Sequence, residues 1–109
     1  WFKRMNYDEI LNDAENVIIK ENQIIEIGTK IKQNLPKYQF MGIIKISKKD
    51  FFKMHTFYKS LNNSNIDMTN FLNKFVKKKK GLIKVIKYNK YWFEIDNQKD
   101  LAVAKNSSF

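Results

Sequence analysis

The chain contains no cysteine, one proline, three glycines and, among its 21 basic residues, a single arginine, Arg4. Without cysteine, disulfides and cysteine-ligated zinc sites are excluded, which fits the reducing cytoplasm that we expect for this protein. Arginine is the residue best suited to bidentate contacts with phosphate or guanine, so its scarcity argues against dedicated nucleic-acid binding.

Long apolar runs are also missing. No run approaches the ~20 residues that cross a bilayer, and no apolar segment of a signal peptide follows the start of the chain. We therefore expect no membrane partner. The chain begins with Trp1 rather than methionine, so we expect that an N-terminal portion precedes it.

Basic residues dominate what is present: 21 of them stand against 11 acidic ones, giving a formal net charge of +10. Such an excess attracts polyanions, but it equally reflects a composition rich in lysine, isoleucine and asparagine. The apolar fraction of 43% and aromatic fraction of 15% argue against disorder. The net charge therefore indicates which partners the chain could attract. The fold has to be predicted from the pattern of apolar residues.

Three strands are predicted in the first half of the chain. Residues 16–20 and 23–27 are rich in β-branched side chains and flank a turn at Glu21-Asn22, which predicts a hairpin that ends at Gly28. Residues 38–46 form a mostly apolar run, which is typical of a strand covered on both faces.

Two helices are predicted next. Ser47 and Asp50 have the spacing of a capping box, and behind them an apolar stripe recurs at helical spacing: Phe51, Met54, His55, Tyr58 and Leu61. Asp67 or Thr69 can cap the second helix, which ends in the run of lysines at 77–80 and Gly81. Its expected core face holds Met68, Phe71, Leu72, Phe75 and Val76.

The C-terminal part predicts a second hairpin, residues 82–88 and 91–95, and a final helix with Asn97 as cap and Asp100 three residues later. The order of elements predicts an α/β protein, a mixed sheet with flanking helices, in one domain segment over residues 1–109.

The most distinctive segment is residues 91–104, YWFEIDNQKDLAVA. Side chains alternate along a strand, so Glu94 and Asp96 are expected on the same side where the strand ends and the helix begins. Open α/β sheets bind ligands at such ends, and Mg²⁺ usually takes one or two carboxylates plus substrate phosphates. Spacing alone leaves two interpretations of Asp96: a magnesium ligand, or a cap of the final helix.

This segment resembles the closing motif of the sugar-phosphate and choline-phosphate nucleotidyltransferases, which is an aromatic residue, Glu-Ile-Asp, a short spacer, Asp-Leu and a helix of small residues. Residues 13–15 with 28–30, and residues 40–47, resemble further segments of that family in the same order. The resemblance implies a Rossmann-like (GT-A-like) fold, of which this chain is the C-terminal half. It also implies that Asp96 is the second ligand of a catalytic Mg²⁺, while the first ligand and a glycine-rich nucleotide loop lie in the missing N-terminal half.

The resemblance assigns further positions. Lys30 matches a lysine that contacts the acceptor phosphate, although a solvated surface lysine fits equally. Trp1 resembles part of an aromatic pair that boxes a quaternary ammonium, and a plain core aromatic is the alternative. Glu15 is expected either to recognise the acceptor or to pair with a nearby lysine. Glu94 is expected to contribute to substrate binding. His55, the only histidine, has no catalytic partner in the pattern and is assigned no role.

The expected activity is transfer of a nucleotidyl group from a nucleoside triphosphate, CTP above all, to a phosphomonoester such as phosphocholine or a sugar 1-phosphate. The expected partners are these two substrates, Mg²⁺ and the N-terminal half, and the sequence leaves a homodimer open. The alternative is a small basic module that binds RNA or a protein without catalysis.

Overall fold

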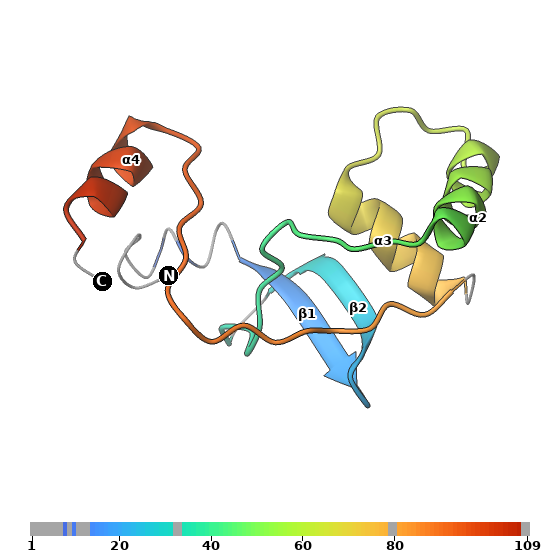
Figure 1. Cartoon of the computed structure of the whole chain (residues 1–109), viewed down its shortest axis with the longest axis horizontal. Coiled ribbons are helices and arrows are strands. Elements are labelled where there is room, and N and C mark those ends of the chain that lie inside the picture. Colours follow the sequence, from blue (N-terminus) through green and yellow to red (C-terminus); the bar gives the residue numbers. More distant parts are fainter. Residues whose placement is uncertain (1–7, 9, 11–13, 32–33, 79–80, 108–109) are drawn as a thin grey trace. The chain divides into compact units, whose positions relative to one another are not determined.

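The computed structural model describes residues 8, 10, 14–31, 34–78 and 81–107 of the chain. They form a small mixed α/β protein with two strands, β1 (Glu15–Lys20) and β2 (Gln23–Lys30), and three helices, α2 (Lys48–Ser60), α3 (Met68–Lys77) and α4 (Gln98–Lys105) (Figure 1). The chain divides into two compact units. We call Glu15–Ile86 the central unit, and Trp1–Ala14 with Lys87–Phe109 the terminal unit.

The predicted first hairpin is confirmed, but its second strand continues through Gly28 to Lys30 instead of ending at the glycine. Strands β1 and β2 pair antiparallel through a two-residue turn in which Glu21 (φ 53°) and Asn22 (φ 61°) both have positive φ. This backbone is that of the primed turns, whose twist matches the twist of the strands. The register shifts at Gly28, which has φ +86° and forms a bulge.

The expected sheet is wrong beyond this hairpin, because the described residues form a two-stranded antiparallel sheet and not a mixed one. The predicted strand 82–88 is reduced to one isolated bridge, between Lys84 and Gln23, with Ile24 donating to the carbonyl of Ile83 at 2.9 Å. The predicted strand 91–95 is not formed. Both segments have strand-like composition, but a strand also needs a neighbour that continues the hydrogen-bond ladder.

The predicted strand 38–46 is not formed either. Gly42 interrupts it with φ +82°, and no strand among the described residues pairs with it. The apolar side chains of this segment were expected to be covered on both faces, yet Ile43 is 75% exposed. A run of β-branched residues reports propensity, whereas strand formation depends on pairing and burial elsewhere in the fold.

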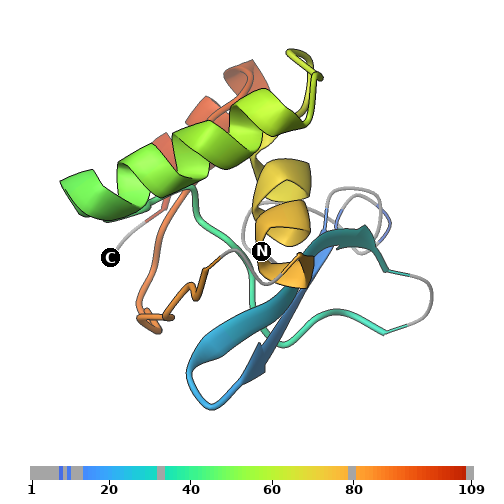
Figure 2. The same ribbon diagram turned by 90° about the vertical axis from the view of Figure 1, so that its right-hand side faces the viewer.

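Helix α3 supplies most of the core of the central unit. Phe71, Leu72 and Phe75 are buried against Ile27 of β2 and Phe57 of α2, and both views place α3 between the hairpin and α2 (Figures 1 and 2). The predicted core face is confirmed at these three positions of α3. It is wrong at Met68, which is 54% exposed and lies in the first turn of α3.

Polar contacts fix α3 on β2. The amide of Ile27 donates to Asn73 Oδ1 at 3.1 Å, and Lys77 Nζ lies 3.2 Å from Glu26 Oε1. The bulge at Gly28 brings the backbone of β2 against Thr69 of α3. The amide of a bulged strand has lost its ladder partner, so the side chain of Asn73 satisfies a donor that would otherwise be buried alone.

Helix α2 begins where the capping box predicts. Ser47 Oγ accepts a hydrogen bond from the Asp50 amide at 3.1 Å and donates one to Asp50 Oδ2 at 2.8 Å. Only Phe57 of this helix is buried. Among the described residues, no helix is long and apolar enough to cross a membrane.

Candidate functional site

The start of helix α4 is built by a reciprocal pair of hydrogen bonds. Asn97 is the N-cap, and its Oδ1 accepts a hydrogen bond from the Asp100 amide at 2.9 Å. In return Asp100 Oδ2 accepts a hydrogen bond from the amide of Asp96 at 3.1 Å. Asp100 is 5% exposed, so its carboxylate belongs to the structure of this turn. The predicted cap with Asn97 and Asp100 is confirmed.

This geometry excludes one of the two interpretations of Asp96, namely that its side chain caps helix α4. The cap of α4 is Asn97, so the side chain of Asp96 is not the cap of the helix. Asp96 is exposed, and its backbone is held by Asp100. The carboxylate is therefore presented to solvent from a fixed backbone at the N-terminus of a helix.

Glu94 lies two residues before Asp96 and is also exposed. The segment that carries both residues is not a strand, so the alternation expected to place them on one side does not apply. Among the described residues, no three His, Cys, Asp or Glu side chains cluster closely enough to hold a metal ion. A single exposed carboxylate still suits Mg²⁺ as a hard oxygen donor, since this ion completes its shell with waters and substrate phosphates.

Glu15 and Lys30 lie opposite each other in the central unit. They are cross-strand partners at the open end of the hairpin, Glu15 as the first residue of β1 and Lys30 as the last of β2. Directly opposed residues have Cβ atoms about 4.5–5.5 Å apart, so opposite charges attract there. The structure thus brings these two predicted residues together, while Glu94 and Asp96 belong to the terminal unit.

Trp1 lies outside the described residues. His55 is exposed on α2 and stacks on Phe51, with ring centroids 6.2 Å apart and ring planes 4° apart. This aromatic contact gives His55 a packing role, in keeping with the absence of any catalytic assignment.

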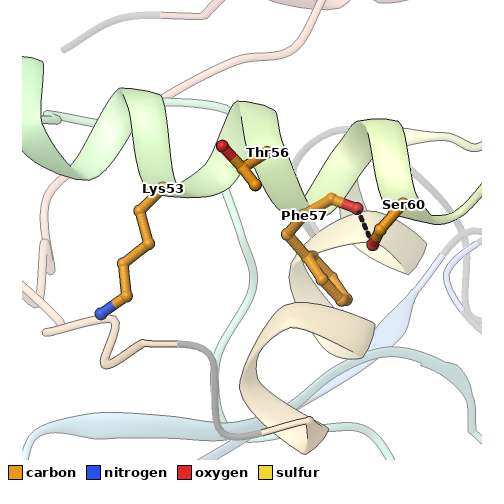
Figure 3. A pocket seen from close by; sticks show the side chains of 4 residues that line it. All are labelled: Lys53, Thr56, Phe57 and Ser60. Atoms are coloured by element: carbon orange, nitrogen blue, oxygen red, sulfur yellow. Dashed lines mark hydrogen bonds between the residues drawn. The ribbon is translucent and has the colours of Figure 1, made fainter.

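A hollow of about 380 Å³ lies on one side of α2 and is lined by Lys53, Thr56, Phe57 and Ser60, whose side chains are drawn in Figure 3. The hydroxyls of Thr56 and Ser60 donate to backbone carbonyls of their own helix, at 2.9 and 2.6 Å. Because these two hydroxyls already donate to carbonyls, they are not available to an anion. Among the four lining residues, the ammonium of Lys53 is then the side-chain group that could bind one.

A second hollow, which we call the apolar groove, measures about 400 Å³ and is lined by Ile44, Ile46, Phe51, Met54, His55, Tyr58, Ile66, Asp67, Met68 and Phe71. Its one carboxylate, Asp67, is the N-cap of α3. The Asn70 amide that donates to it lowers the pKa of Asp67, burial opposes this, and the side chains of Asn70 and Thr69 lower the pKa further. Sequence reasoning identified the stripe on α2 but did not assign it to a groove.

Comparisons of the chain with protein-family models, with curated proteins and with solved structures found no match. Neither hollow contains a residue that the sequence predicts for the site. The Glu-Ile-Asp segment at residues 94–96 therefore remains the feature of the chain that points most directly to a function.

Proposed function

We propose that this chain is the C-terminal half of a nucleotidyltransferase that joins a nucleotide, with CTP as the leading donor, to a phosphomonoester such as phosphocholine or a sugar 1-phosphate. The observation that carries the proposal is Asp96. Within a segment that resembles the closing motif of that family, its carboxylate is exposed and does not cap α4, and its backbone amide donates a hydrogen bond to Asp100.

The proposed reaction is an in-line displacement at phosphorus. An oxygen of the acceptor phosphate attacks the α-phosphorus of the triphosphate, the bond from the α-phosphorus to the bridging oxygen breaks, and pyrophosphate leaves with that oxygen. Positioning and stabilisation of negative charge dominate the catalysis of such transfers. Mg²⁺, when bound, supplies charge neutralisation at the phosphate oxygens.

In this proposal the side chains divide the work. The carboxylate of Asp96 would hold the metal ion together with an Asp of the proposed N-terminal half. Asn97 and Asp100 keep its backbone in place through the two hydrogen bonds at the start of α4. The resemblance assigns the ammonium of Lys30 to the acceptor phosphate, and Glu15, Glu94 and Trp1 to recognition of the acceptor.

The first test measures pyrophosphate release from CTP and phosphocholine by a protein that joins this chain to its N-terminal half. We expect Asp96→Asn to lower kcat by about a hundredfold or more, since a lost electrostatic contact at the reacting phosphate has this size. Asp8→Asn, which changes an exposed carboxylate outside the motif, is the matched control. Wild-type turnover by the Asp96 variant at saturating Mg²⁺ would remove the metal-ligand role.

A second test uses the chain by itself. Mn²⁺, a paramagnetic substitute for Mg²⁺, is titrated in while the amide signals are followed by NMR. We expect the signals of residues 95–98 to broaden first, and Asp96→Asn to abolish that selectivity. Equal broadening around every exposed carboxylate would show that Asp96 has no preference for the ion.

A further inference from the structure

The apolar groove of the central unit is open to solvent. Five of its large apolar lining residues are exposed: Met68 at 54%, Phe51 at 53%, Ile44 at 40%, Ile46 at 39% and Tyr58 at 37%. Its floor is formed by side chains that pack against the core, Met54, Ile66 and Phe71. Contiguous apolar surface of this kind, at the side of a packed core, is typical of an interaction site.

The surroundings of the groove are basic. Between residues 44 and 71, which contain all of its lining, five lysines are exposed: Lys45, Lys48, Lys49, Lys53 and Lys59. None of the five forms an ion pair with another residue that the structure describes. The two acidic residues of this stretch, Asp50 and Asp67, are both engaged in helix caps. The lysines of this stretch therefore have no ion-pair partner among the described residues, and two of them, Lys48 and Lys59, are close in the helix to groove-lining residues.

Two of these lysines border the stripe along α2. Lys48 lies one helical turn before Phe51, and Lys59 lies one turn after His55, directly after Tyr58, so the two lysines lie near the two ends of the groove-lining part of α2. The chain's whole net charge of +10 lies in the central unit, which holds 15 lysines against five acidic residues. The groove thus lies in the unit that carries the chain's excess of positive charge, which favours negatively charged partners.

We propose that the apolar groove binds an acidic amphipathic helix of a partner protein. The stripe from Phe51 to Tyr58 covers two helical turns, about 10 Å, which matches apolar anchors at positions i, i+3, i+4 and i+7 of an incoming helix. Acidic residues beside those anchors meet Lys48 and Lys59. This binding is separate from the proposed nucleotidyl transfer and does not rest on it.

The charge and shape of the groove disfavour other occupants. A second copy of this chain would bring like charges together, which costs free energy across an interface. Nucleic acid matches the charge, but its phosphates cannot fill an apolar floor without losing hydration. An anionic membrane would contact the protruding Phe51 but, being broad and flat, would not reach Met54 and Phe71 at the bottom.

The test measures fluorescence anisotropy of a labelled synthetic helix with leucines at i, i+3, i+4 and i+7 and glutamates at the flanking positions, titrated with the full chain. Two control peptides replace the leucines by alanine or the glutamates by lysine. We expect binding of the first peptide alone, weakened by salt because the flanking charges are exposed.

Matched variants locate the binding. Phe51→Ala is expected to weaken binding about tenfold, the size typical of an aromatic anchor. Phe52→Ala is the control, since Phe52 is 57% exposed on the same helix but does not line the groove. Lys48→Glu with Lys59→Glu is expected to weaken binding more than the same change at Lys20 and Lys84, which lie on the hairpin side.

Three outcomes would overturn the proposal. The first is that the acidic peptide shows no binding even when the chain is present at millimolar concentration. The second is equal loss for Phe51→Ala and Phe52→Ala. The third is tighter, Phe51-dependent binding of an RNA oligonucleotide or of phosphatidylserine vesicles that the acidic peptide does not displace. Circular dichroism of each variant excludes unfolding as the cause of a loss.

Discussion

Helices α2 and α3 are neighbours in one compact unit, yet they use their apolar residues differently. The ten-residue α3 buries Phe71, Leu72 and Phe75, whereas the thirteen-residue α2 buries only Phe57. Phe51 and Phe52 of α2 remain more than half exposed. The apolar content of a helix therefore does not measure its contribution to the core, because burial depends on what faces it.

The polar contacts of the two helices differ in the same way. Helix α3 is linked to β2 by Asn73 and Lys77, through residues 46 and 51 positions away in the chain. The hydroxyls of α2 bond within their own helix, Thr56 to Phe52 and Ser60 to Phe57. We infer that α3 holds the central unit together and that α2 presents a surface.

The largest expected effect is that of truncating the core face of α3. Leu72 is 2% exposed, so Leu72→Ala is expected to lower the free energy of unfolding by about 2–5 kcal/mol. Met54→Ala on α2, a half-buried position, is expected to cost clearly less. Urea unfolding followed by circular dichroism measures both, and equal losses would contradict the division of roles.

The second-largest expected loss of stability comes from disturbing the contact between α3 and the bulge of β2. At Gly28, with φ +86°, an added Cβ would lie 2.9 Å from Thr69 Cβ, so Gly28→Ala combines backbone strain with a clash. We expect a loss of about 1–3 kcal/mol in the free energy of unfolding. Gly42 has φ +82° but open space around it, so Gly42→Ala measures strain alone and is expected to cost less. A larger loss at Gly42 would show that the approach of Thr69 is unimportant.

The smallest effect concerns the caps. Asp67→Ala on α3 and Ser47→Ala on α2 each remove a capping acceptor, at a cost of about 1 kcal/mol. Because α3 carries the core, we expect the Asp67 change to lower the stability of the central unit and the Ser47 change to fray only α2. Amide hydrogen exchange distinguishes these outcomes.

The Asp67 cap also has a pH signature. Hydrogen bonds from Asn70 lower the pKa of Asp67 in the folded protein, so its stabilisation is present above pH about 4 and is lost as the pH falls through the folded pKa. Asp67→Asn keeps a good capping residue without the titration. The stability difference between wild type and this variant is therefore expected to shrink on acidification, and a constant difference would contradict the role of the charge.

Sequence reasoning was most successful where partners are close in the chain. The turn at Glu21-Asn22 and the caps at Ser47 and Asn97 were predicted from residues that are close in the chain, and of the two caps offered for α3, Asp67 and Thr69, the structure has Asp67. It was least successful for the extended apolar segments, where the strands predicted at 38–46, 82–88 and 91–95 lack the partners that would complete them. The metal-ligand role of Asp96 stays a prediction.

The sequence by itself determined the hairpin turn, the helix starts and the excess of lysine in the central unit, because each depends on residues adjacent in the chain or on composition. Only the tertiary structure decided that Phe57 rather than Phe51 is buried, that Asn73 caps the bulge of β2, and that an apolar groove stays open beside α2. These features depend on which distant groups meet, and a helix with apolar residues on several sides does not specify which side will be covered.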